Sequence, residues 1–146
     1  MITTDRFEQR KFLAQAWQRY QSNNKLAPLE HQLAKIIERH PEYQDIIKNL
    51  EDEYFPEQGK TNPFLHINLH LSLQDQLSLN QPNGIQKIYN ALLTKMKGAH
   101  QVEHIMMEQI AEMIFISQKY NKPMDLQNYL ESVSYTHLTL PTILLV

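Results

Sequence analysis

Residues 62–77 read NPFLHINLHLSLQDQL, and this stretch decides the fold class of the chain. Apolar and polar residues alternate from Leu65 to Leu73, a period of two that is typical of a half-buried strand. Leucine, however, is a strong helix former, and β-branched residues are sparse here. Asn62 followed by Pro63 is typical of a helix cap and first turn. We therefore predict a helix buried on most sides, with apolar residues on two arcs: Leu65, Leu69, Leu73 and Leu77, and Phe64, Ile67 and Leu71.

Apolar residues at helical spacing predict further helices on both sides of this stretch. Before it, we expect helices over about 5–21 and 28–40, and a short helix over about 42–50. After it, we expect helices over about 85–97 and 100–120, and a short helix over about 125–130. Only 3 glycines are present, which disfavours a fold made of tight hairpins. The sequence therefore predicts an all-α fold, a single compact helical bundle of about five to six helices with short connections.

Composition limits the classes of function. The chain has 146 residues with 14 basic and 16 acidic side chains, and no run of like charge that would indicate a nucleic-acid partner. The cysteine count of 0 excludes disulfides and thiolate metal sites. The first residues lack an apolar signal core, and no apolar run reaches membrane-spanning length. We therefore expect a cytoplasmic protein with no membrane partner, and a protein partner or homo-oligomer that the sequence does not identify.

The composition changes abruptly after Glu131. Residues 132–146 contain no Asp, Glu, Lys or Arg, and Leu and Thr alternate around His137 to Leu140 as in a strand that has no partner. The reverse translation of Val133 to Thr142 resembles the transposase-end adapter used in sequencing libraries. We therefore expect residues 1–131 to form a single helical domain and residues 132–146 to be a non-native read-through tail.

Four histidines form the main chemical lead. His66 and His70 are four residues apart, as are His100 and His104, and on a helix this spacing places both imidazoles on one face. Two such pairs on two helices could offer four nitrogens to a divalent transition metal, namely zinc, iron, manganese or nickel. Glu103 adds a carboxylate that could be a ligand, an orienting group or a base. The sequence thus predicts a metal site made of His66, His70, His100, His104 and Glu103.

Other interpretations of these residues remain open. The histidines could be core residues of a non-enzymatic interaction module, or a histidine–glutamate pair could transfer protons without a metal. Residues 100–104 also fit the inverted zinc-protease pattern H-x-x-E-H, but no further carboxylate-bearing helix follows. Di-iron carboxylate proteins need Glu-x-x-His motifs, which are not clean around these histidines.

Two further histidines are expected to have simpler roles. His40 lies at the end of the second predicted helix, where a cationic ring would complement the helix dipole. Its neighbours Glu42 and Tyr43 could still approach the metal site. His31 is expected to lie on the surface with Lys35 and Glu38.

Several short motifs resemble those of one bacterial family, called domain of unknown function 1841. The motifs are Pro28-Leu29-Glu30, His40-Pro41-Glu42-Tyr43, Asn62-Pro63-Phe64-Leu65-His66 and His70-Leu71, with Asp5-Arg6, Ala16-Trp17, Pro82, Gly84-Ile85, Glu103-His104 and Tyr129-Leu130. The resemblance covers nearly all of residues 5–131. Gln74-Asp75-Gln76 and Ile114-Phe115 depart from the family's pattern. The resemblance implies that the predicted metal ligands belong to a family pattern, but it implies no particular activity.

Overall fold

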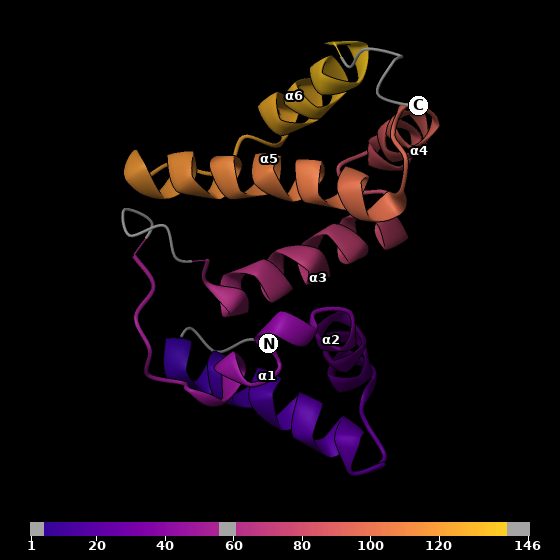
Figure 1. Cartoon of the computed structure of the whole chain (residues 1–146). Helices are drawn as coiled ribbons and strands as arrows, with labels where there is room; N and C mark the ends of the chain where they lie inside the picture. The colour runs from indigo at the N-terminus through magenta and orange to yellow at the C-terminus, as the bar shows by residue number, and fades with distance from the viewer. Residues whose placement is uncertain (1–4, 56–60, 140–146) are drawn as a thin grey trace. The chain divides into compact units, whose positions relative to one another are not determined.

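The computed structural model describes residues 5–55 and 61–139, which are all helix, turn or loop, with no strand among them (Figure 1). The all-α prediction is confirmed. None of the helices in these two ranges is long and apolar enough to cross a lipid bilayer. The elements are α1 (Arg6–Gln21), α2 (Pro28–Glu38), the 3-10 helices η1 (Pro41–Tyr43) and η2 (Ile46–Lys48), α3 (Pro63–Leu79), α4 (Ile85–Lys95), α5 (Ala99–Lys119) and α6 (Leu126–Thr139).

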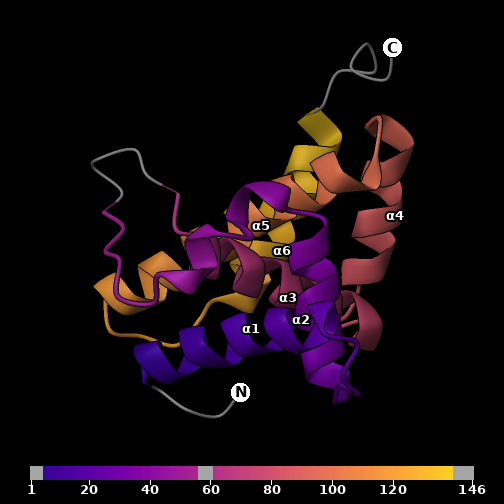
Figure 2. The same ribbon diagram turned by 60° about the horizontal axis from the view of Figure 1, so that its bottom comes forward.

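The chain divides into two compact units, residues 1–71 and residues 72–146, and the boundary falls inside α3. The first unit holds α1, α2, the two 3-10 helices and the beginning of α3. The second holds the rest of α3 together with α4, α5 and α6 (Figure 2). The single domain that the length indicates stays a prediction.

In the first unit, α1 packs against α2 as the helical spacing of their apolar residues predicts. The carboxylate of Asp5 accepts hydrogen bonds from the backbone N–H groups of Phe7 at 2.9 Å and Glu8 at 3.3 Å, and so caps α1. Helix α2 begins with a proline, whose missing N–H is not needed in a first turn. Both helices contribute to one apolar core, which includes Leu13, Ala16, Trp17, Leu33, Ile36 and Ile37.

The short α-helix predicted over residues 42–50 is wrong, because two 3-10 helices, η1 and η2, occupy this segment. His40 before Pro41 has non-helical dihedral angles (φ −126°, ψ 71°), because proline disfavours the α conformation in the residue before it. A helix of nine residues is marginal by itself, and 3-10 turns are common in such short connections.

Arg10 anchors the segment that follows η2. Its side chain is buried, and Nη1 donates hydrogen bonds to the backbone carbonyl oxygens of Leu50 and Asp52, both at 2.8 Å. The guanidinium carbon also lies 4.5 Å from the ring centroid of Phe64, within cation–π range. This one side chain of α1 therefore contacts both the segment after η2 and the first turn of α3.

Helix α3 forms as predicted, despite its strand-like alternation. Asn62 caps it, since Oδ1 accepts hydrogen bonds from the N–H groups of Phe64 at 3.0 Å and Leu65 at 3.2 Å. Phe64 and Ile67 are buried, whereas Leu65 is 49% exposed. The prediction that Leu65 belongs to a buried arc is therefore wrong, because the first turns of α3 keep one face open to solvent.

The second unit is built from amphipathic helices. Gly84 precedes α4 with φ 98°, a left-handed conformation that glycine adopts without steric strain. Helix α5 buries the core face that its spacing predicts, namely Val102, Met106, Ile110 and Met113. Helix α6 packs against both α4 and α5.

Helix α6 is longer than predicted and continues through Thr139. The strand expected around His137 to Leu140 is therefore wrong for residues 137–139, while Leu140 lies outside the described residues. Tyr129 and Val133 are both buried and are one helical turn apart, so α6 continues one apolar face beyond residue 131. The non-native origin of residues 132–146 stays a prediction.

Candidate metal centre

His40 is the first member of the site, and its position follows from the end of α2. The ring is 2% exposed, and Nδ1 lies 2.8 Å from the backbone carbonyl oxygen of Ile36. Because a carbonyl oxygen can only accept, Nδ1 is the nitrogen that carries the proton in this contact. In the neutral ring, the lone pair is then on Nε2, which is buried as well.

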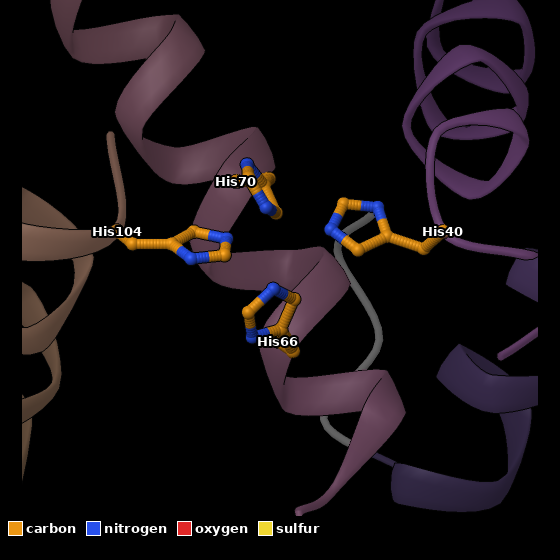
Figure 3. Close-up of side chains that lie close together, drawn as sticks. All are labelled: His40, His66, His70 and His104. Atoms are coloured by element: carbon orange, nitrogen blue, oxygen red, sulfur yellow. The ribbon is translucent and has the colours of Figure 1, made fainter. Parts of the chain in front are cut away.

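His66 and His70 project from successive turns of α3 and turn toward His40 (Figure 3). The ring centroids of His66 and His70 are 4.9 Å apart. The centroid of His40 is 5.1 Å from that of His66 and 4.7 Å from that of His70. Three imidazoles of the first unit thus form a close triangle in which His70 is fully buried.

Within the first unit, one ring nitrogen of each of His40, His66 and His70 lies within 4.8 Å of the other two (Figure 3). In a tetrahedral zinc site, Zn–N bonds of about 2.0–2.1 Å place the ligand nitrogens roughly 3.3–3.4 Å apart. Small rotations of the side chains would therefore bring these three nitrogens to coordination distance. These three residues are called the histidine group below, and His104 belongs to α5 in the second unit.

Tyr43 covers part of the histidine group. Its ring stacks on His40 with a centroid distance of 5.5 Å and an interplanar angle of 6°. It also meets the ring of His66 edge-on, with centroids 5.5 Å apart. Burial, with a smaller contribution from Glu42, raises the pKa of the Tyr43 hydroxyl, so the ring is a neutral phenol near pH 7.

The sequence-predicted ligands divide into two sets. His66 and His70 lie in the histidine group of the first unit, whereas His100, Glu103 and His104 belong to α5 in the second unit. His100 is exposed, and its ring lies against that of His104 with centroids 4.1 Å apart. The i, i+4 spacing thus brings both pairs of rings together, each on its own helix.

Glu103 is nevertheless unusual, because its side chain is only 8% exposed. Within residues 5–55 and 61–139, no hydrogen bond or ion pair of the structure involves its carboxylate. A carboxylate without a protein partner could balance the charge of a cation bound at His104.

His40 is the member of the group that the predicted ligand set lacks. The sequence places it at the end of α2, where a cationic ring would complement the helix dipole, and Nδ1 does contact the Ile36 carbonyl at that end. The position of His40 beside His66 could not be predicted from the sequence, because 26 positions separate the two residues and no helical period relates them. The only available signal was the neighbouring Pro41-Glu42-Tyr43 motif.

A family model for a domain of unknown function, DUF1841, matches residues 5–135. The chain belongs to the DUF1841 family. The match includes His40, His66, His70 and His104 and confirms the resemblance seen in the sequence. No curated protein and no solved structure matches this DUF1841 chain. The family description states no activity, so the functional argument rests on the geometry.

Proposed function

We propose that this protein binds a divalent transition metal through His40, His66, His70 and His104. The observation that carries the proposal is the triangle of His40, His66 and His70, whose ring centroids are 4.7–5.1 Å apart in the first unit. Neutral imidazole is the commonest metal ligand in proteins, because one of its ring nitrogens carries a lone pair. His104 is proposed as the fourth donor.

The donor set limits the metal. Four imidazole nitrogens without thiolate suit zinc, nickel or iron better than manganese, which prefers oxygen ligands. Four neutral ligands also leave the full charge of the ion uncompensated, and a buried charge needs a counter-charge. Glu103, next to His104 in the sequence, is the proposed counter-charge, and it would balance the charge of the ion without coordinating it. A water that completes the coordination shell would permit hydrolytic chemistry, but metal binding itself is the function proposed.

A metal explains the convergence of the imidazoles better than packing does. Core packing needs apolar surface, and it gives no reason for ring nitrogens of His40, His66 and His70 to meet within 4.8 Å. The orientation of His40 by a backbone carbonyl also supports a ligand role, because metal-bound histidines usually donate their second N–H in this way. A cytoplasmic location belongs to the same proposal, and cell fractionation tests it.

Elemental analysis of the full chain, purified without a histidine tag, tests the proposal. We expect near-stoichiometric metal, and its loss in a His66→Ala/His70→Ala variant. The matched control is His31→Ala/His100→Ala, which removes the same number of histidines from outside the group and should retain the metal. Circular dichroism should show that both variants fold.

Metal-free parent protein that also takes up no zinc, nickel, iron or manganese on titration would overturn the proposal. Equal metal loss in the His31→Ala/His100→Ala control would overturn the assignment of the ligands. In the first case, an interaction module with structural core histidines becomes the better interpretation, and a search for a protein partner or homo-oligomer follows.

A further inference from the structure

A second candidate site lies entirely within the first unit, between α1 and η2. It is a cavity of about 480 Å³. Small-molecule sites in proteins typically have volumes of roughly 300–1,000 Å³, so the cavity is large enough for a metabolite. Its chemically informative lining residues are Lys11, Gln15, Trp17, Gln18, Gln21 and Lys48.

The polar lining forms an ordered stripe along α1. Lys11, Gln15 and Gln18 follow i, i+4, i+7 spacing, which places them on one face of the helix, and Gln21 extends this face by one turn. From residue 11 to residue 21, an α-helix rises about 15 Å. The cavity therefore has a cation at one end of a row of three carboxamides.

The charge of the cavity is positive. Lys11 and Lys48 line it, and no lining residue is acidic. Lys48 pairs with Asp45 at 3.3 Å on the surface. Lys11 has no ion pair with any other residue of ranges 5–55 and 61–139. Lysine ammonium groups are well suited to hold phosphate, because they act as point charges that donate to several oxygens.

The rest of the lining combines carboxamides with apolar side chains. Carboxamides both donate and accept hydrogen bonds, and so match hydroxyl groups in either orientation. The apolar part comes from Ala14, Trp17, Ile47 and Leu50. This surface can contact the C–H groups of a ligand, so the lining fits a molecule that carries both hydroxyl and C–H faces.

We propose that this cavity binds a phosphorylated sugar or polyol. Lys11 and Lys48 hold the phosphate, the glutamine carboxamides bind the hydroxyl groups, and the C–H face of the ligand lies against Trp17. The inference is independent of the metal centre, because none of the histidines lines this cavity.

Trp17 makes the proposal testable, because it is the only tryptophan of the 146-residue chain. Its fluorescence is followed while glucose 6-phosphate is added, and calorimetry provides a second readout that does not depend on the indole. We expect saturable binding of glucose 6-phosphate and clearly weaker binding of glucose and of inorganic phosphate. A Lys11→Gln/Lys48→Gln variant should bind about tenfold more weakly or worse, since two charge-assisted contacts are lost.

The matched control is Lys87→Gln/Lys97→Gln, which makes the same charge change at exposed positions of the second unit. It should bind glucose 6-phosphate as the parent does, and thermal melts should show that both variants fold. Absence of binding by both methods would overturn the proposal. Inorganic phosphate that binds as tightly as glucose 6-phosphate would overturn the sugar specificity, and glucose that does so would overturn the role of the lysines.

Discussion

The Nδ1 atom of His40 lies 2.8 Å from the backbone carbonyl oxygen of Ile36, four residues earlier. This carbonyl also accepts the backbone N–H of Arg39 at 3.1 Å, so the imidazole adds a second donor to the last turn of α2. The same contact fixes the proton on Nδ1 and leaves Nε2 as the lone-pair nitrogen. One hydrogen bond therefore joins the ring to the end of α2 and orients the proposed metal ligand.

His40→Ala should weaken zinc binding by about 100-fold or more, because loss of a group that merely orients a ligand already costs about 10–100-fold. Competition against a chromophoric chelator measures the affinity. His31→Ala is the control, since His31 is exposed and lies outside the histidine group. Unchanged affinity in His40→Ala would leave only the contact with the end of α2.

The two histidines of α5 should respond differently to substitution. His104→Ala should reduce zinc affinity strongly, whereas His100→Ala should leave it within about threefold, because an exposed ring outside the ligand group contributes little. Calorimetric titration of both variants measures the difference. Equal losses would mean that His100, as the sequence predicts, is a ligand in solution.

Glu103→Gln should affect the metal-bound protein and leave the metal-free protein nearly unchanged. Without metal, the substitution removes no hydrogen bond or ion pair of the described residues and should change the free energy of unfolding by less than about 0.5 kcal/mol. With zinc, it removes the proposed counter-charge and should lower affinity. Denaturant unfolding with and without zinc measures both effects, and Glu108→Gln on the exposed face of α5 is the control. A variant destabilised in both states would show a purely structural role.

Stability at alkaline pH should depend on Tyr129. Burial raises the pKa of its hydroxyl above the ordinary value of 10.0, and the hydroxyl donates a hydrogen bond to Gln76 at 2.6 Å. Because the folded state holds this proton more tightly than the unfolded state, the stabilisation is complete below about pH 10 and is lost as the pH rises further.

Tyr129→Phe should therefore be less stable than the parent by about 1 kcal/mol at neutral pH, through loss of the hydrogen bond. The difference should shrink at alkaline pH, because the variant has no such proton to lose. Urea unfolding from neutral to alkaline pH measures how the free energy of unfolding of each protein changes with pH. Tyr120→Phe at an exposed position is the control. Parallel slopes for parent and Tyr129→Phe would contradict the prediction.

The helices were predictable because each carries its own local signal. Asn62-Pro63 and the leucine-rich run were sufficient to assign α3, although its alternation is typical of a strand. The exposure of Leu65 was not predictable, since periodicity alone does not tell which of two apolar arcs is covered. For α6, the lack of charge after Glu131 concealed that Val133 continues the face of Tyr129.

The histidine group was predictable only in part for a related reason. The i, i+4 rule correctly pairs His66 with His70, because both lie on one helix. It also pairs His100 with His104, but helical spacing does not say which ring turns inward. His40 reaches the group through the chain reversal after α2, a tertiary relationship that leaves no period in the sequence.

Arg10 limits how short a fragment can be made that still holds His40, His66 and His70 in place. A peptide cut from Pro28 to Ser72 would contain His40, His66 and His70, yet it would lack the guanidinium that holds the carbonyls of Leu50 and Asp52. Those carbonyls belong to the segment between η2 and α3. Their donor, Arg10, precedes Leu50 by 40 positions and Asp52 by 42 positions in the chain. Grafting this centre onto another scaffold would therefore require α1 as well, although α1 contributes none of its imidazoles.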